Sequence, residues 1–290
     1  MDNSGLVIVD KPAGWTSHDV VGKMRRLAKT RRVGHAGTLD PMATGVLVLG
    51  VGKATRLLGH LALTEKEYDA TIRLGQSTNT DDAEGEITAT ASAASVADEA
   101  LRAGVAALTG PIQQVPPQVS AIKVNGERAY KMARKGEDVA LAARPVTVHS
   151  FTVTDVRREG DLIDVDASVA CSSGTYIRAL ARDLGASLGC GGHLTALRRT
   201  RVGPYDLAMA RTLDQFAEKP EILPMGEAVA AVFPRRDVSA DDARRIAHGG
   251  RLPAAGLGPG PVGVFAPDGT LLALVEEQGG QAKPLAVFVP

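Results

Sequence analysis

A glycine-rich loop that ends in Asp40, followed by a strand without polar side chains, is the feature that most constrains this chain. The loop reads Gly34-His35-Ala36-Gly37-Thr38-Leu39-Asp40-Pro41, and residues 46–49 are all valine or leucine. A short run that is apolar on both faces predicts a buried strand in the middle of a sheet. Pro41 restricts Asp40 to extended conformations. The chain therefore places a carboxylate on a loop beside a rigid strand, which suits catalysis, although most loop aspartates only shape a turn.

The remaining pattern predicts an α+β fold. Residues 5–10, 68–74 and 162–170 read as strands, because they are apolar or alternate between apolar and polar side chains. Thr16 or Ser17 is expected to cap a helix whose apolar positions follow helical spacing. Strands and helices do not alternate as regular βαβ units require, so the pattern favours α+β over a doubly wound sheet.

The character of the sequence changes near residue 236. Residues 237–248 predict a short helix, and Pro267-Asp268-Gly269 predicts a turn between two strands. We therefore expect a large domain over residues 1–235 and a small β-rich domain over residues 236–290. Within the large domain, residues 123–146 contain few strongly apolar side chains and read as an excursion from the core.

Charge is balanced over the whole chain but not along it. The sequence has 33 lysines and arginines and 33 aspartates and glutamates. Residues 1–60 carry nine basic and four acidic side chains, residues 61–110 carry three and nine, and residues 111–160 carry eight and five. Arg128 and Lys131 lie on an expected short helix of the excursion. A basic surface on one face can bind a nucleic acid even in a neutral protein, whereas the alternative is ordinary solvated helix faces.

Several classes of protein are disfavoured by what the sequence lacks. The start has no basic stretch with a long apolar run, and no apolar run approaches the roughly 20 residues that span a bilayer, so we expect a cytoplasmic protein without membrane contact. Cys171 and Cys190 cannot form a disulfide framework or a zinc cluster. Residues 258–263 match a dinucleotide-binding string, but their prolines oppose the required turn, and Gly52-Lys53 lacks the flanking residues of a phosphate-binding loop.

Arg178 and Tyr68 are the other candidates that the residues themselves suggest. Arg178 falls in the first turn of a predicted helix, where a positive charge opposes the helix dipole at a cost of about 0.3–1 kcal/mol. Such an arginine is easier to understand if it faces a carboxylate, which it would keep ionised. Otherwise it simply reaches solvent. Tyr68 is either a core aromatic or one of the few rings able to stack on a base.

Several ordered segments together resemble one family. They are Lys11-Pro12-Ala13-Gly14-Trp15-Thr16-Ser17, Arg32-Val33 with the Asp40 loop and Met42-Ala43-Thr44-Gly45-Val46-Leu47, Lys66-Glu67-Tyr68-Asp69-Ala70, Cys171-Ser172-Ser173-Gly174-Thr175-Tyr176-Ile177-Arg178 and Leu194-Thr195-Ala196-Leu197-Arg198-Arg199-Thr200. This set resembles the TruB family, bacterial enzymes that form pseudouridine at position 55 of transfer RNA. The resemblance covers about residues 5–235.

The resemblance implies a fold and a reaction. The fold is the pseudouridine-synthase fold, with a mixed, mainly antiparallel central sheet flanked by helices. Residues 123–146 would be an inserted thumb-like RNA-binding segment, and residues 236–290 a PUA-like domain. The reaction breaks the bond between ribose C1′ and N1 of uridine, turns the base and joins C1′ to C5. It needs one carboxylate, which attacks C1′, attacks the base or removes a ribose proton.

The same resemblance implies roles for individual residues. Asp40 matches the essential carboxylate, and Arg178 matches the residue that pairs with it. Tyr68 matches the residue that stacks on the target base and helps to remove the C5 proton. Leu197 matches an apolar wall of the pocket, and His35 matches a residue that contacts the RNA where the uridine has left its stack.

Four further basic residues are implied on the RNA side of the site. Lys11 matches a motif that supports the active-site loop and is counted with the substrate-binding residues. Lys123, Arg128 and Lys131 are expected to contact RNA phosphates. The implied partner is the T-arm of transfer RNA, bound by a monomer that needs no obligate protein partner and no cofactor.

Three alternatives remain at this stage. A transfer-RNA-binding protein without catalysis would keep the basic surfaces but has no need for Asp40, Arg178 and Tyr68 together. A glycoside or nucleoside hydrolase would use two carboxylates, and Asp81-Asp82 is the nearest second acid in the sequence. A related synthase acting on another RNA is the closest competitor.

Overall fold

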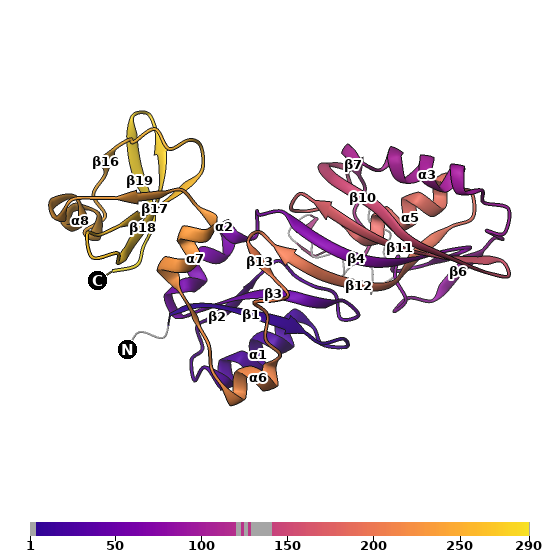
Figure 1. Ribbon diagram of the computed structural model, residues 1–290, viewed down its shortest axis with the longest axis horizontal. Helices are drawn as coiled ribbons and strands as arrows, with labels where there is room; N and C mark the ends of the chain where they lie inside the picture. Colours follow the sequence, from indigo (N-terminus) through magenta and orange to yellow (C-terminus); the bar gives the residue numbers. More distant parts are fainter. Residues whose placement is uncertain (1–3, 120–122, 125–126, 129–140, 290) are drawn as a thin grey trace.

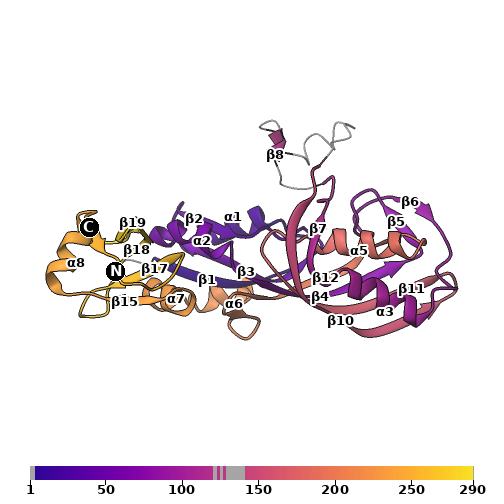
Figure 2. The same cartoon turned by 90° about the horizontal axis from the view of Figure 1, so that it is seen from above.

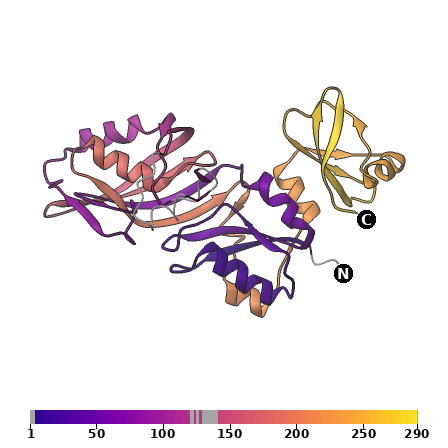
Figure 3. The same cartoon turned by 180° about the vertical axis from the view of Figure 1, so that it is seen from behind.

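The computed structural model describes residues 4–119, 123–124, 127–128 and 141–289. Figure 1 shows a long twisted sheet with helices beside it and a separate small sheet at the C-terminal end. Figure 3 shows the same two sheets from behind, with helices α1 (Ser17–Leu27) and α6 (Leu213–Glu218) lying side by side. The predicted α+β class is confirmed.

Ten strands form the large sheet. They are β1 (Gly5–Lys11), β2 (Val33–Ala36), β3 (Thr44–Val51), β4 (Lys66–Leu74), β7 (Gly110–Gln114), β10 (Arg144–Glu159), β11 (Leu162–Cys171), β12 (Gly192–Val202), β13 (Tyr205–Asp206) and β14 (Leu223–Pro224). The main path runs β14-β1-β3-β12-β4-β11-β10-β7, with β2 added to β3 and β13 added to β12. The expected strand at residues 46–49 is therefore central.

The large sheet consists of two antiparallel halves joined by one parallel contact. Strand β3 runs parallel to β12 over two residue pairs, Arg198 with Thr44 and Arg199 with Gly45. All other neighbours in this sheet are antiparallel. The sheet is thus mixed and mainly antiparallel, as the resemblance implied. On β12, Arg198 also donates to both carboxylate oxygens of Asp10 on β1, at 2.8 and 3.1 Å.

Helices cover the two halves separately. The remaining helices are the 3₁₀ helix η1 (Gly52–Leu57), α2 (Leu58–Leu61), α3 (Asp98–Ala107), α5 (Ile177–Ser187), α7 (Met225–Val232) and α8 (Ala240–Ala247). Helices α1 and α6 lie beside the β1–β3 half, whereas α3 and α5 lie beside the β4–β12 half (Figure 1). The expected cap of α1 is Thr16, whose hydroxyl accepts from the Asp19 amide while the Asp19 carboxylate accepts from the Thr16 amide.

The structure describes residues 123–146, the expected excursion, only in part. Two short pairs lie outside the large sheet, β5 (Gln76–Thr78) with β6 (Ile87–Thr90) and β8 (Lys123–Val124) with β9 (Glu127–Arg128). Figure 2 shows β8 standing away from the sheet on the side where α1 lies. The prediction of a helix is wrong at Arg128. This residue belongs to strand β9 and pairs with Lys123 of the antiparallel strand β8. Lys131 lies outside the described residues.

The small sheet has its own core and shares another with the main body. Its strands are β15 (Arg235–Asp237), β16 (Leu252–Pro253), β17 (Pro261–Phe265), β18 (Leu271–Gln278) and β19 (Gln281–Val287). One buried cluster, which we call the shared cluster, joins Leu6 and Ile8 of β1 to Phe265 and Leu271 of the small sheet and to Phe288, the residue after β19. The small sheet is therefore docked on the main body through apolar contacts.

Among the helices that the structure describes, none is both long and apolar enough to cross a membrane. Among the same described residues, no group of three or more histidine, cysteine, aspartate or glutamate side chains is arranged to hold a metal ion.

Gly45 permits the close approach of the two half-sheets. Its φ is +96°, a backbone conformation that residues other than glycine rarely adopt. A Cβ at this position would lie 2.2 Å from the carbonyl oxygen of Arg199. A side chain here would therefore push β3 away from β12 at the parallel contact.

We expect Gly45→Ala to lower the free energy of unfolding by on the order of 3 kcal/mol, through backbone strain and the clash with β12. Urea denaturation measures this change. Gly59→Ala is the matched control, because Gly59 lies in α2 and a methyl group added there would meet no neighbouring atom within 4 Å. Equal stability of the two variants would show that the junction tolerates a wider spacing.

Candidate active site

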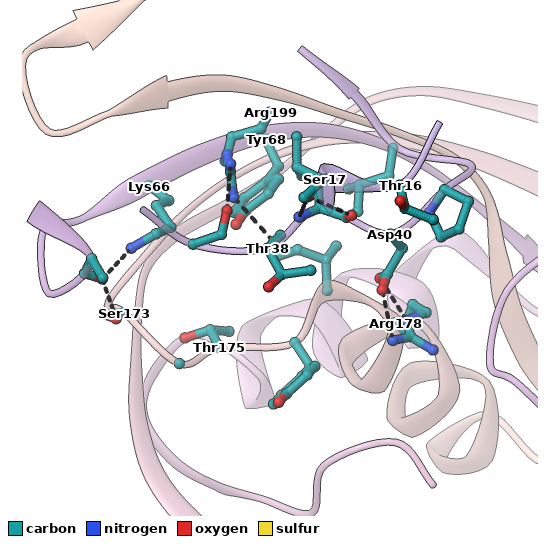
Figure 4. A pocket seen from close by; sticks show the side chains of 18 of the residues that line it. Thr16, Ser17, Thr38, Asp40, Lys66, Tyr68, Ser173, Thr175, Arg178 and Arg199 are labelled. Carbon is teal, nitrogen blue, oxygen red and sulfur yellow. Dashed lines mark hydrogen bonds and ion pairs between the residues drawn. The ribbon is translucent and has the colours of Figure 1, made fainter. Parts of the chain in front are cut away.

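A cavity of about 500 Å³ opens where the two half-sheets meet. It is lined by residues 37–41 of the glycine-rich loop, by residues 16–18 at the start of α1 and by residues 173–178 before and within α5. The sheet contributes side chains from β4 and β12 (Figure 4). Its volume lies within the roughly 300–1,000 Å³ typical of small-ligand sites.

Asp40 and Arg178 meet in this cavity although they lie 138 residues apart in the sequence. The Arg178 Nε lies 3.0 Å from Asp40 Oδ2, and Nη2 lies 3.2 Å from Oδ1 (Figure 4). The carboxylate that the helix position of Arg178 predicted is therefore present. About a third of the Asp40 side chain, 36%, is exposed, and it faces the cavity.

The guanidinium of Arg178 is fixed on several sides. It also donates to the carbonyl oxygens of Thr80 and Val119, each at 2.9 Å. The Asp82 carboxylate lies 3.4 Å from Nη1. Because these acceptors hold the guanidinium in one place, Arg178 presents the same two nitrogens to Asp40.

Asp82, one of the two acids considered as a second carboxylate, does not line the cavity. Its side chain is buried and accepts hydrogen bonds from the Thr80 hydroxyl and the Glu84 amide. Its neighbour Asp81 pairs with Arg182 at 3.0 Å. Among the described residues that line the cavity, Asp40 is thus the one that carries a carboxylate.

Burial and two neighbouring charges shift the pKa of Asp40. Burial of the carboxyl raises its pKa, the Arg178 guanidinium lowers it, and the negative charge of Asp82 raises it further. The net effect is a raised pKa. The carboxylate is therefore more basic than an ordinary surface aspartate while remaining paired with a cation.

Lys11 lies behind the catalytic loop and does not line the cavity, so it is placed to support the loop, and its place among the substrate-binding residues stays a prediction. It is completely buried, and its ammonium donates to the carbonyl oxygens of Pro12, Trp15 and Pro41 at 2.9, 2.6 and 3.1 Å. Burial lowers its pKa to about 8. Lys11 therefore ties the segment after β1 to the segment that carries Asp40.

His35 does not line the cavity either. The neighbouring side chain of His18 does. The two rings stand edge to face with centroids 5.6 Å apart. Burial lowers the pKa of His35 to about 4, so its ring is neutral at neutral pH. Its Nδ1 is buried without a hydrogen-bond partner among the described residues.

Tyr68 and Leu197 line the cavity from neighbouring strands. Tyr68 on β4 is opposite Arg199 on β12, and Leu197 is opposite Ala70. Burial raises the pKa of the Tyr68 hydroxyl, and the nearby Arg199 guanidinium opposes this shift. The ring and the leucine side chain give the cavity an apolar wall beside the Asp40 carboxylate.

Arg199 was missed as a site residue by the sequence analysis. It is almost completely buried and donates to the carbonyl oxygens of Val46, Gly37 and Thr38 at 2.7, 3.1 and 3.4 Å. The sequence did contain a signal for Arg199. It lies two residues after Leu197, so the two side chains point to the same face of a strand. An arginine on the inward face of a strand needs acceptors, and here the glycine-rich loop supplies them.

Lys66 and Ser17 were missed as well. The Lys66 ammonium donates to the carbonyl oxygens of Ala62 and Thr64 at 2.9 and 2.7 Å, and burial lowers its pKa to about 8. The Ser17 hydroxyl donates to the Leu39 carbonyl at 3.0 Å and accepts from the Leu39 amide at 2.9 Å. These contacts are to main-chain atoms, which leave no mark in a sequence.

The basic residues of the excursion are not brought into the site by the described structure. The main chains of Lys123 and Arg128 belong to the β8–β9 pair, and the structure describes nothing of their side chains. Lys131 lies outside the described residues. Their expected RNA contacts stay predictions.

Three consecutive stretches of the chain match known families. Residues 25–177 match the family described as TruB family pseudouridylate synthase (N terminal domain). Residues 178–229 match the tRNA pseudouridylate synthase B C-terminal domain, and residues 233–289 match tRNA Pseudouridine synthase II, C terminal. The chain belongs to the TruB family. The resemblance seen in the sequence is thereby confirmed.

Curated relatives of this TruB chain match it over nearly their whole length. A protein of Thermobifida fusca (strain YX), named tRNA pseudouridine synthase B, is 66% identical over 288 residues, which cover 98% of each chain. A protein of the same name from Arthrobacter sp. (strain FB24) is 65% identical and covers 99% of this chain and 97% of its own.

Solved structures support the fold of this TruB chain. A chain in the structure titled "Crystal Structure of a Cbf5-Nop10-Gar1 Complex" is 28% identical with a TM-score of 0.75, covering 99% of this chain and 85% of its own. A chain in "Structure of H/ACA RNP bound to a substrate RNA containing 2'-deoxyuridine" is 26% identical with a TM-score of 0.74. The match covers 100% of this chain and 86% of the other. The implied pseudouridine-synthase fold is confirmed.

We expect Asp82→Asn to lower the pKa of Asp40 towards its ordinary value, because the variant removes the repulsion that helps to raise it. The Asp40 carboxyl carbon, followed by ¹³C NMR across a pH titration, reports this shift directly. Asp81→Asn is the isosteric control, because Asp81 pairs with Arg182 instead. Equal shifts in both variants, or none in Asp82→Asn, would contradict this account of the electrostatics.

Proposed function

We propose that this chain converts uridine 55 in the T-loop of transfer RNA to pseudouridine. As a TruB-family member with relatives named tRNA pseudouridine synthase B, it is a pseudouridine synthase acting on transfer RNA. The observation that carries the finer proposal is the Asp40–Arg178 pair in a cavity with a tyrosine on one wall. Position 55 comes from the resemblance of the Asp40 segment and its companions to the family.

The proposed reaction rearranges one nucleotide without an external reactant. The bond from C1′ to N1 breaks, the base turns, and a bond from C1′ to C5 forms. The C5 proton leaves and N1 gains a proton, so product and substrate are isomers. The target uridine must first leave its stack, which costs a few kcal/mol that contacts in the cavity and to the phosphates offset.

The residues singled out in the sequence have the following roles in this proposal. Asp40 is the essential carboxylate, which attacks C1′, attacks the base or removes a ribose proton. Arg178 keeps Asp40 ionised and oriented despite its raised pKa. Tyr68 stacks on the flipped base and helps to remove the C5 proton, while Leu197 forms part of the apolar wall of the pocket. His35 contacts the RNA where the uridine has left its stack.

The wider assignment follows from the same proposal. Residues 1–235 form the catalytic domain, residues 236–290 form a PUA-like domain, and residues 123–146 close on the T-arm. The chain acts as a monomer in the cytoplasm without cofactor or obligate protein partner. A hydrolase that uses two carboxylates fits the geometry less well, because Asp82 is turned towards Arg178 and away from the cavity.

Asp40→Asn is expected to reduce turnover by more than about 10³-fold while transfer-RNA affinity changes by less than about threefold. Turnover is measured as tritium released from transfer RNA labelled at uridine C5, and the modified position is mapped in the product. Asp81→Asn is the control, since its side chain lies outside the cavity. Release by the native protein at another position would overturn the assignment to position 55, and full activity of Asp40→Asn would remove the carboxylate from the reaction.

Tyr68→Phe keeps the ring but removes the hydroxyl, so we expect it to bind transfer RNA normally and to release tritium about 10²-fold more slowly. Tyr68→Leu removes the stacking surface as well and should also raise KM. Single-turnover tritium release and a binding isotherm separate the two effects. A wild-type rate for Tyr68→Phe would show that the hydroxyl takes no part in proton removal.

A further inference from the structure

A second, open hollow of about 390 Å³ lies next to the catalytic cavity. It is lined by Gly14, Trp15, His18, Asp19, Gly22 and Arg26. His18 lines both this hollow and the catalytic cavity, so the two spaces share a wall. None of the roles assigned above uses Trp15 or Arg26.

Trp15 is an exposed aromatic side chain on a fixed backbone. It is the single tryptophan of the chain, and 37% of it is exposed. Its carbonyl oxygen accepts from the buried ammonium of Lys11 at 2.6 Å, and the same ammonium donates to Pro41, the residue after Asp40. The amide of Gly14 also donates to the Pro41 carbonyl at 2.8 Å. These hydrogen bonds therefore fix the position of the segment that carries Trp15 relative to the catalytic loop.

The charges around the hollow favour a nucleotide. Arg26 is exposed on α1, and its side chain makes no hydrogen bond or ion pair with any residue that the structure describes. The opposing charge, Asp19, is already engaged, because its carboxylate accepts from the amide and the hydroxyl of Thr16 at 2.9 and 2.6 Å. A guanidinium can hold a phosphate and an exposed indole can stack on a base, and both groups line this one hollow.

We propose that this hollow binds a nucleotide that neighbours the target uridine, with its base on Trp15 and its phosphate on Arg26. The inference rests on the proposed function, because it requires an RNA whose target nucleotide occupies the catalytic cavity. Removing that nucleotide from its stack exposes a face of its neighbour. An aromatic platform fixed beside the catalytic loop covers that face and offsets part of the unstacking cost.

The position of Trp15 makes a direct test possible. Since it is the single tryptophan, the intrinsic tryptophan fluorescence of the protein reports on this hollow alone. The Asp40→Asn variant of the full chain is titrated with a T-arm stem–loop RNA, so that the RNA binds without turnover. We expect the fluorescence to be quenched with the same Kd that an independent filter-binding measurement gives.

Replacing single nucleotides identifies the occupant. Stem–loops that are abasic on the 5′ side or on the 3′ side of the target uridine are titrated separately. We expect one of the two to bind without quenching the fluorescence. Unchanged fluorescence at saturation with the intact stem–loop would overturn the proposal, as would undiminished quenching by both abasic RNAs.

Variants of the hollow provide an independent measure. Trp15→Ala is expected to raise KM about tenfold with little change in kcat, and Trp15→Phe should restore most of the loss because it retains an aromatic face. Arg26→Gln should reduce the slope of log Kd against log salt concentration by about one, whereas Arg26→Lys should keep it. Urea denaturation of each variant checks that the protein remains folded. A KM for Trp15→Ala equal to that of the native protein would contradict the proposal.

The outcomes for the two proposals are distinct. If the native protein modifies uridine 55 but Trp15 does not respond to RNA, the catalytic proposal stands and the proposal for the hollow fails. If the native protein neither binds nor modifies the T-arm, the proposed function itself fails.

Discussion

The active site depends on one narrow contact, the two residue pairs over which β3 runs parallel to β12. Every other strand pairing of the large sheet is antiparallel, so this contact is where two separate half-sheets become one. Consecutive arginines of β12 strengthen it, because Arg198 pairs with Asp10 on β1 and Arg199 binds the carbonyl of Val46 on β3. The cavity opens at this junction, and its walls come from both halves.

Buried cations organise the loops around the cavity. Lys11, Lys66 and Arg199 each donate to carbonyl oxygens of irregular segments, and the pKa of each lysine is lowered to about 8 by burial. A buried charge without partners is strongly unfavourable, so each cation fixes the loop whose carbonyls it binds. The glycine-rich loop is held in this way from two sides, by Lys11 through Pro41 and by Arg199 through Gly37 and Thr38. Asp40 thus sits on a loop that has little freedom to move.

The sequence predicted the fold class, the central strand and the pairing of Arg178 with a carboxylate, each for a physical reason. Apolar residues on both faces require burial within a sheet, and an arginine at a helix N-terminus opposes the helix dipole, which a facing carboxylate offsets. The supporting residues were not predictable in the same way. Lys11 was counted with the substrate-binding residues from the family resemblance alone, and its burial depends on three main-chain acceptors that the fold supplies. Arg199 depends likewise on carbonyls that only the folded backbone brings together.

The shared cluster has a consequence for how the chain folds during synthesis. Strand β1 is synthesised before the small sheet, yet Leu6 and Ile8 belong to a cluster that includes Phe265, Leu271 and Phe288. Strand β1 also pairs with β14, more than two hundred residues later. The half-sheet that contains β1 therefore remains incomplete until β14 has emerged from the ribosome. The small sheet completes a core that β1 begins, so a chain that stops before β17 leaves one part of that core exposed to solvent.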